Sequence, residues 1–127
     1  MKSLKEGSSA LVLVLASAGI LLTGCKQIEA IQRLEIQNIV FQNVGDGTYE
    51  GYQDNKIVTA KVRVSVKDGR VADIQLLQHA HGPQHGAEAI VARVLEEQSL
   101  RVDAVSGATY SSKVVLKAIE LALRKGL

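Results

Sequence analysis

The clearest pattern along the chain is an alternation of apolar and polar side chains over residues 56–67. Ala60, Val62, Val64 and Val66 are separated by Lys61, Arg63, Ser65 and Lys67. Because successive side chains of a strand point to opposite faces of a sheet, this spacing predicts a strand with one buried face and one solvated face. Asp68-Gly69 follows directly and suits a two-residue hairpin turn, since both residues tolerate positive φ.

The hairpin turn implies that residues 70–78 fold back as an antiparallel partner. Ile74 and Leu76 are expected on the buried face of that second strand. A two-stranded hairpin is at best marginally stable alone, so we expect a further strand beside it. Residues 48–52 are the candidate, as an edge strand.

Two helical patterns follow the strands. Over residues 87–98, apolar side chains recur at helical spacing and charged side chains occupy the opposite side. A second amphipathic pattern starts near Ser111-Ser112 and stops over residues 124–126, where two basic residues and a Gly suit a helix C-terminus. Strands first and helices later predict an α+β fold, in which the two amphipathic helices cover one face of a small antiparallel sheet made of the hairpin and the edge strand.

The N-terminus carries a different pattern. Lys2 and Lys5 precede residues 10–22, which are uncharged and almost wholly apolar. A basic start, a short apolar run and small residues ahead of a cut are typical of a secretory signal peptide. As a helix, this run would rise about 20 Å, short of the roughly 30 Å hydrocarbon core of a bilayer. Its length favours a cleaved signal peptide over a permanent transmembrane helix.

Residues 22–25, Leu-Thr-Gly-Cys, resemble the lipobox of bacterial lipoproteins. The resemblance implies that Cys25 is acylated with a diacylglyceryl group and becomes the first residue of the mature chain. The alternatives are an uncleaved membrane anchor and a buried, free Cys25.

The segment that follows Cys25 is rich in Gln, Asn and Ile. Ile28, Ile31 and Leu34 repeat at roughly helical spacing, which predicts a short helix or tether before an extended lead into the domain. A Gly-Asp-Gly break at residues 45–47 marks where the domain begins. The predicted organisation is a lipoprotein signal peptide over residues 1–24, a lipidated Cys and tether over residues 25–44, and one domain over residues 45–127.

Composition narrows the classes of function. A chain of 127 residues allows one domain with a core and excludes a multidomain enzyme. Its 15 basic and 13 acidic side chains give a formal net charge of +2, so no basic field points to nucleic acid as a partner. Cys25 is the only Cys of the chain, which excludes an internal disulfide and a CxxC site.

Three His residues, His79, His81 and His85, lie within seven positions after the last predicted strand. Gly and Pro residues among them predict a surface loop. Three imidazoles could ligate Zn or Cu, although no acidic residue or Cys lies among them to complete a ligand set. They could instead line a ligand site or be solvated. The sequence leaves these three interpretations open, and we assign no metal site.

Residues 103–109, Asp-Ala-Val-Ser-Gly-Ala-Thr, form the second candidate site. They make a small-residue turn that leaves the Thr109 hydroxyl at the entrance of the last helix. Gly107 and Ala108 keep bulk away, so a large ligand could approach the backbone. Free N–H groups and the dipole at a helix N-terminus favour an anion, and phosphate is the natural candidate. The alternative interpretation is that four hydroxyls only cap the helix: Ser106, Thr109, Ser111 and Ser112.

Asp103-x-x-Ser106-Gly107-Ala108-Thr109 resembles the D-x-x-S-G-A-T/S signature of the FMN-binding domain family. The likeness extends over about residues 46–126. That family occurs in subunits of ion-pumping membrane electron-transport complexes and in small extracytoplasmic flavoproteins. There, a Mg-dependent flavin transferase takes FMN from FAD and joins its phosphate to the motif Thr or Ser hydroxyl as a phosphoester.

The resemblance implies that Thr109 is the acceptor of covalent FMN. Asp103, Ser106, Gly107 and Ala108 would then be recognition and packing residues of the cofactor site. It leaves open whether His79, His81 or His85 touches the isoalloxazine, and His79 is included among the cofactor-binding candidates. Tyr49, Tyr52 and Tyr110 are candidates either for stacking on the flavin or for ordinary packing.

The implied function is that of a flavoprotein anchored by its lipid to the extracytoplasmic face of the bacterial cell membrane. It would relay electrons between a membrane donor and an acceptor that the sequence does not identify, with FMN supplying one- or two-electron chemistry. No general acid–base pair is visible, which favours an electron carrier over an enzyme acting alone. The alternatives are a noncovalent flavin-binding sensory module and a structural or interaction lipoprotein.

Overall fold

Three antiparallel strands form the sheet of the computed structural model, which describes residues 28–80 and 84–127. They are β1 (Gly47–Asp54), β2 (Thr59–Lys67) and β3 (Arg70–Ala80), with β2 in the centre. The side chains predicted to face inward from β2 are all buried. Asp68 and Gly69 have φ values of 53° and 71°, which confirms the predicted hairpin turn.

Several strand boundaries differ from the predicted ones. β1 is confirmed as an edge strand but extends beyond residues 48–52 at both ends. β2 begins at Thr59 and not at residue 56, because Lys56 has a φ of 63° and the Asn55 N–H donates to the Val58 carbonyl across a turn. β3 continues beyond residue 78 and therefore includes His79. Ile74 is buried as predicted, whereas Leu76 is only partly buried, beside a shift in the β2–β3 register.

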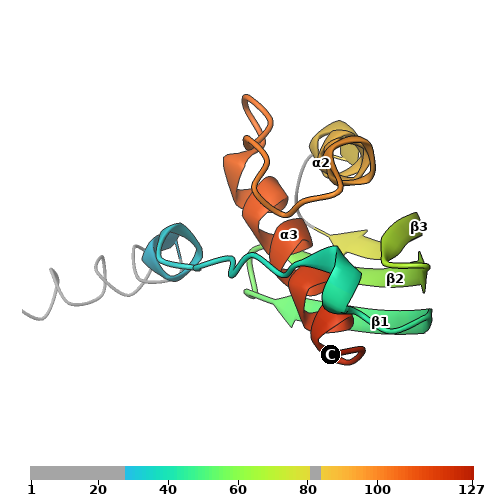
Figure 1. Cartoon of the computed structure of the whole chain (residues 1–127). Helices are drawn as coiled ribbons and strands as arrows, with labels where there is room; N and C mark the ends of the chain where they lie inside the picture. Colours follow the sequence, from blue (N-terminus) through green and yellow to red (C-terminus); the bar gives the residue numbers. More distant parts are fainter. Residues whose placement is uncertain (1–27, 81–83) are drawn as a thin grey trace, which may run out of the picture.

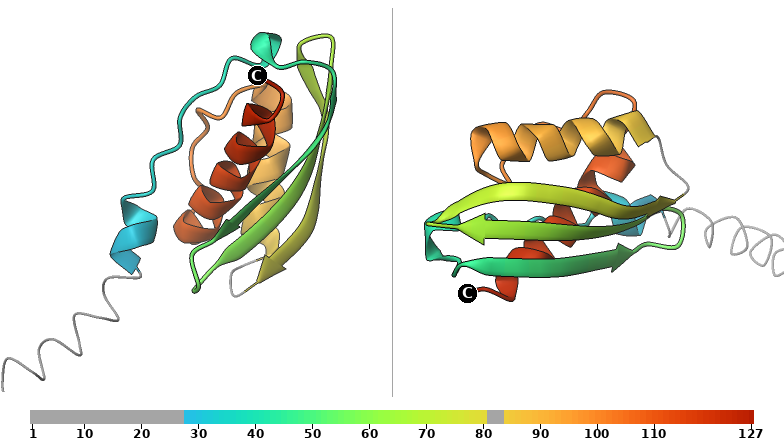
Figure 2. Two further views of the ribbon diagram at one scale, coloured as in Figure 1. Left: turned by 90° about the horizontal axis from the view of Figure 1, so that it is seen from below. Right: turned by 90° about the vertical axis from the view of Figure 1, so that its right-hand side faces the viewer.

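Two helices cover one face of the sheet, α2 (Gln84–Glu97) and α3 (Thr109–Arg124), as Figures 1 and 2 show. α3 packs across β1 and β2, and α2 lies over β3 and beside α3. This arrangement confirms the predicted α+β fold. Each helix begins earlier than predicted: α2 at Gln84 instead of residue 87, and α3 at Thr109 instead of Ser111.

The core lies between the sheet and the helices and consists mainly of Val, Ile, Leu and Ala side chains. The contact between β1 and α3 is especially close at Gly51. A Cβ built at Gly51 would lie 1.8 Å from the Ala118 carbonyl oxygen of α3. The absence of a side chain at Gly51 therefore allows the axis of α3 to approach the sheet.

The N-terminal segment, residues 28–40, packs against this domain. Residues 28–32 are helical, the chain is then extended, and a short 3-10 helix, η1 (Phe41–Asn43), leads to β1. Ile31 and Ile39 are buried in the same core as the helices. Residues 28–40, which belong to the stretch expected to be a tether, are thus folded onto the domain, because several of their apolar side chains pack against its core.

The predicted signal peptide and Cys25 lie outside the described residues. Within residues 28–80 and 84–127, no helix combines the length and the apolar character needed to cross a membrane.

Candidate functional site

The loop between α2 and α3 returns the chain to the N-terminal end of α3 and carries the 103–109 motif. Its shape is fixed by short polar contacts. The Arg93 guanidinium donates to the Asp103 carbonyl oxygen at 2.6 Å. Ser112 Oγ accepts a hydrogen bond from the Val105 N–H at 3.1 Å and donates to the Ala108 carbonyl oxygen at 2.7 Å. The buried Ser112 therefore holds the turn against the first turn of α3.

Gly107 and Thr109 lie at the exposed side of this turn. Gly107 has a φ of 78°, and a Cβ added there would meet no atom within 4 Å. This backbone conformation therefore favours glycine, and the missing side chain leaves space in front of the turn. Thr109 is the first residue of α3. Among the residues that the structure describes, no hydrogen bond engages the Thr109 hydroxyl, so this hydroxyl is available to a ligand.

A pocket of about 360 Å³ opens beside Thr109. Its lining residues, which define the Thr109 pocket, are Gln32, Gly107, Thr109, Tyr110 and Lys113. The Lys113 ammonium donates to the Gln32 carbonyl oxygen at 2.6 Å, and the Gln32 amide donates to the Tyr110 hydroxyl at 3.3 Å. One wall of the pocket thus comes from the N-terminal segment.

Ala108 is the N-cap residue of α3, and no side chain caps the helix. The interpretation of the four hydroxyls as helix caps is therefore wrong for this structure. Ser112 is used inside the turn, and Ser111 Oγ lies 3.2 Å from His79 Nε2. The first N–H groups of α3 carry the partial positive charge of the helix end, because a helix leaves these donors without intrahelical partners. An uncapped helix start beside a hydroxyl and a cation suits a phosphate group.

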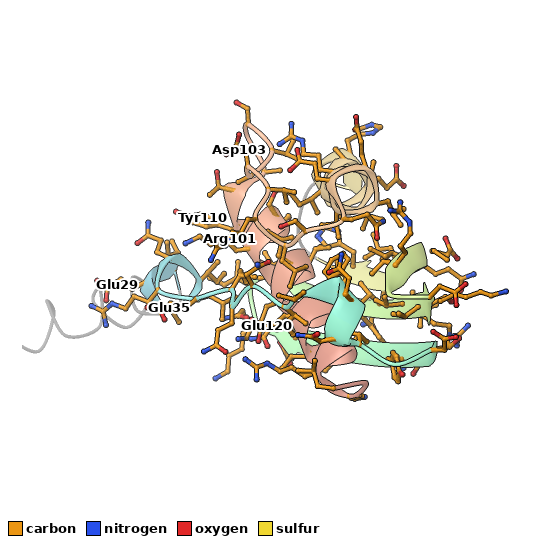
Figure 3. The ribbon with its side chains drawn as sticks, viewed as in Figure 1. Glu29, Glu35, Arg101, Asp103, Tyr110 and Glu120 are labelled. Atoms are coloured by element: carbon orange, nitrogen blue, oxygen red, sulfur yellow. The ribbon has the colours of Figure 1, made fainter. Side chains whose placement is uncertain are left out.

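The remaining predicted residues of the motif are not among the lining residues of the pocket. Ala108 is buried, and Ser106 is exposed on the turn. Asp103 is exposed on the α2–α3 loop, as Figure 3 shows together with Tyr110 at the start of α3. Within the described ranges, no hydrogen bond involves the Asp103 carboxylate. The assignment of Asp103 and Ser106 as recognition residues stays a prediction.

Neither His79 nor His85 lies in the predicted surface loop. His79 lies in β3, and His85 lies exposed on α2. The difference arises because α2 begins at Gln84, so that Gly86, expected to mark a loop, is a buried residue of this helix. His81 lies outside the described residues. In the part of the chain that the structure describes, no three His, Cys, Asp or Glu side chains are placed to hold a metal ion.

His79 contacts the first turn of α3. Its Nε2 faces the buried Ser111 hydroxyl, and its Nδ1 is buried without a hydrogen-bond partner among the described residues. The tyrosines divide between roles. Tyr110 lines the Thr109 pocket, whereas the Tyr49 hydroxyl donates to the Gly45 carbonyl oxygen at 2.7 Å near the other end of the domain. Tyr52 is exposed on the sheet.

Sequence reasoning missed two lining residues, Lys113 and Gln32. Lys113 stands four positions after Thr109, and residues at that spacing share one face of a helix. This signal could have identified it. Gln32 is remote in sequence from the motif, and only the packing of the N-terminal segment brings it to the pocket.

An α+β domain with an open pocket at an uncapped helix start, containing a free hydroxyl and an ammonium group, has a site suited to a phosphorylated ligand. A family model described as the FMN-binding domain matches residues 51–124, more than half of the chain. The chain therefore belongs to the FMN-binding domain family and is a flavin-binding protein. The match includes Gly107, Thr109 and Lys113 of the pocket.

One similar protein comes from Treponema pallidum (strain Nichols) and is described only as an uncharacterized protein. The two sequences are 28% identical over 83 residues, which covers 63% of this chain and 23% of that protein. The chain thus matches about a quarter of the length of this relative.

Proposed function

We propose that this protein carries FMN covalently, as a phosphoester of the Thr109 hydroxyl. The observation that carries the proposal is the position of that hydroxyl: exposed, without a hydrogen bond among the described residues, and open to the Thr109 pocket at the uncapped start of α3. Membership of the FMN-binding domain family supports FMN as the ligand.

The attachment reaction uses FAD and a flavin transferase as partner. Thr109 Oγ1 forms a bond to the phosphorus of the FMN half of FAD and loses its proton. The pyrophosphate bond breaks, and AMP leaves. The Lys113 ammonium lies in the same pocket and supplies positive charge next to the new phosphodiester, and the first N–H groups of α3 add their partial positive charge.

When bound, FMN supplies the transfer of one or two electrons. The chain's own residues hold it. Thr109 fixes its phosphate, Gly107 leaves room beside the turn, and Tyr110 offers an aromatic surface at the pocket wall.

The cellular role we propose is electron relay at the extracytoplasmic face of the membrane. Acylated Cys25 would anchor the protein, a membrane-bound donor would reduce the flavin, and a separate acceptor would reoxidise it. A covalent bond to the flavin suits this location, because a dissociating cofactor would be lost to the surroundings.

Mass spectrometry of protein co-expressed with a flavin transferase tests the attachment. The wild-type protein should gain the mass of one FMN less one water, and Thr109→Ser should keep that gain. Thr109→Ala should lose it. Thr48→Ala is the matched control, because Thr48 is exposed at the start of β1 and lies outside the pocket.

The outcomes separate the proposal from its alternatives. Yellow protein of unmodified mass would indicate a noncovalent flavin-binding module. Colourless, unmodified protein from cells with an active transferase would indicate a structural or interaction lipoprotein, and either result overturns the phosphoester on Thr109.

A further inference from the structure

We propose that the N-terminal segment is a rigid strap that orients the domain on the membrane, with the end that carries Thr109 facing the lipid surface. The inference rests on the proposed lipid anchor at Cys25. It goes beyond that proposal because a lipid anchor alone specifies neither an orientation nor a distance for the flavin.

The N-terminal segment runs alongside α3 in the same direction, as the left view of Figure 2 shows. Three ordered contacts define its course. Gln32 meets Lys113 in the first turns of α3, Glu35 meets Lys117, and Gln37 meets Glu120. At the far end, the Gly45 N–H donates to the Gly126 carbonyl oxygen. The part nearest Cys25 in sequence therefore lies beside the Thr109 pocket.

Apolar side chains of the N-terminal segment pack against the core of the domain. Ile31 is fully buried and Ile39 is 7% exposed, and both belong to the core that contains the helices. Leu34 and Ile36 pack against the same core from between them. Burial of each of these apolar side chains favours the docked segment over the undocked one. Several such residues in one short segment are enough to keep it docked.

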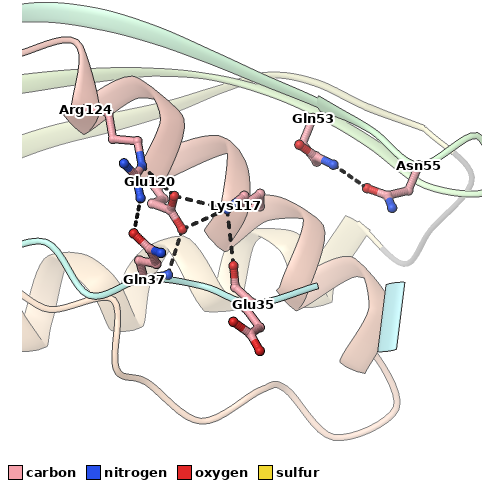
Figure 4. A network of polar contacts seen from close by, with 7 residues as sticks. All are labelled: Glu35, Gln37, Gln53, Asn55, Lys117, Glu120 and Arg124. Carbon is pink, nitrogen blue, oxygen red and sulfur yellow. Dashed lines mark hydrogen bonds and ion pairs between the residues drawn. The ribbon is translucent and has the colours of Figure 1, made fainter. Parts of the chain in front are cut away.

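A buried carboxylate adds polar contacts between α3 and the N-terminal segment, which Figure 4 shows. Glu120 is fully buried, and its Oε1 accepts a hydrogen bond from the Gln37 backbone N–H at 2.7 Å. Lys117 and Arg124 donate to the same carboxylate at 3.1 Å and 2.7 Å. Lys117 also donates to the Glu35 carbonyl oxygen, and Arg124 to the Gln37 side chain. Three charged side chains of α3 thus form hydrogen bonds that hold Glu35 and Gln37 of the N-terminal segment.

Chain length decides which end of the domain is near the anchor. Gln32 is seven positions after Cys25, so the connecting chain spans at most about 25 Å when fully extended. If the segment were undocked, the chain would first join the domain at residue 45, twenty positions after Cys25. The connecting chain could then span about 70 Å. It would also join the domain at the opposite end of α3, about 24 Å along the helix from the Thr109 end.

The proposed orientation determines which surface of the domain faces a partner in the membrane. The docked segment would keep the Thr109 pocket within reach of a donor embedded in the membrane, and would turn the β2–β3 hairpin away from it. The hairpin lies at the other end because the Asp68 N–H donates to Asp46, close to the C-terminus of α3.

Fluorescence quenching in vesicles tests the orientation without requiring flavin. The lipidated full chain would be bound to phosphatidylcholine and phosphatidylglycerol vesicles that contain a lipid with a headgroup nitroxide quencher. One dye is placed at Ser106→Cys, beside the pocket, and the matched dye at Lys67→Cys, by the hairpin turn. Both positions are exposed. No other thiol competes, because Cys25 is the only native Cys and its sulfur carries the diacylglyceryl group in the lipidated chain.

The dye at position 106 should be quenched at least twofold more than the dye at position 67. Equal or reversed quenching in vesicle-bound protein overturns the inference and leaves the anchor intact. Protein that fails to sediment with the vesicles overturns the anchor and the orientation together.

A linker variant identifies the cause of the orientation. Inserting about twenty Gly and Ser residues between Gln27 and Ile28 adds a flexible chain of roughly 25 Å root-mean-square length and leaves every described contact unchanged. If the strap sets the orientation, the difference between the two dyes should largely disappear. A difference that persists at physiological salt would mean that the domain surface itself binds lipid, and would refute the strap.

Discussion

The Lys113 ammonium lies 2.6 Å from the carbonyl oxygen of Gln32, and this contact joins the N-terminal segment to the pocket that contains Thr109. Lys113 therefore takes part both in the pocket and in the docking of the N-terminal segment. It belongs to the face of α3 that carries the proposed FMN acceptor, and it holds the segment that leads toward Cys25.

The first prediction concerns the charge of Lys113. A charge-assisted hydrogen bond is worth about 1.5–3 kcal/mol, so Lys113→Gln should slow flavin attachment by about tenfold or more. Lys113→Arg keeps the charge and should stay within a few fold of wild type. The measurement is the time course of FMN mass gain with purified transferase and FAD.

Lys117→Gln is the control for this prediction. Lys117 also holds a carbonyl of the N-terminal segment, that of Glu35, but it does not line the pocket. Equal slowing in both variants would show that the segment matters and that the Lys113 charge does not.

The second prediction separates the shape of the Gly107 backbone from the space that it leaves. Gly107→Ala should destabilise the domain by about 1–2 kcal/mol, because alanine is strained in the left-handed conformation. Gly107→Asn tolerates that conformation better and should unfold in urea close to wild type. Both variants add bulk beside Thr109, so both should reduce FMN attachment. An Asn variant that attaches FMN at the wild-type rate would show that the space is not needed.

Much of the fold was predictable because it depends on local patterns. The alternation that includes Val62 and Val64, followed by Asp68-Gly69, specifies a hairpin whatever surrounds it. The start of α3 was predicted two residues late, because its N-cap is Ala108, a residue without a capping side chain. The sequence predicts a loop at His85 because Gly86 has a low helix propensity, but the structure places both residues in α2.

The candidate site was predictable only in part for a related reason. The motif residues Gly107 and Thr109 are consecutive with the helix they precede, so their placement follows from sequence. The position of Gln32 at the pocket depends on its contact with Lys113, which lies 81 positions later in the sequence. Apolar spacing shows that a segment has a surface to bury, but it does not show which surface will cover it.

The third prediction concerns acid and Glu120. Burial raises the pKa of the Glu120 carboxyl, but hydrogen bonds from Arg124, the Gln37 N–H and Lys117 together lower it below its ordinary value. The unfolded chain therefore binds this proton more readily than the folded one. The stabilisation is complete above the ordinary Glu pKa of about 4.3 and is lost as pH falls through the lower pKa of the folded state.

Urea unfolding of Glu120→Gln at several pH values tests this. The variant should be less stable than wild type by about 1.5–3 kcal/mol at pH 7, because hydrogen bonds to a charged group are lost. The gap should narrow as pH falls below about 4.3. Glu35→Gln is the control, since Lys117 bonds only to the Glu35 backbone. A gap that does not change with pH would show that the charge of Glu120 is not what holds Gln37.

The fourth prediction concerns the contact between Gly51 of β1 and α3. A Cβ at Gly51 would lie 1.8 Å from the Ala118 carbonyl oxygen and 2.7 Å from the Ala122 backbone nitrogen. Both atoms belong to the backbone and cannot rotate away, so Gly51→Ala must push α3 away from the sheet. We expect the free energy of unfolding to fall by about 1–3 kcal/mol.

Gly45→Ala is the control. At Gly45, an added Cβ meets its nearest atom at an ordinary 3.5 Å, so Gly45→Ala should change stability by less than about 0.5 kcal/mol. Urea unfolding of the two variants under identical conditions makes the comparison. Because α3 carries both Thr109 and the residues that grip the N-terminal segment, a displaced helix should also make that segment more sensitive to protease. Equal stability of the two variants would contradict the close packing of β1 against α3.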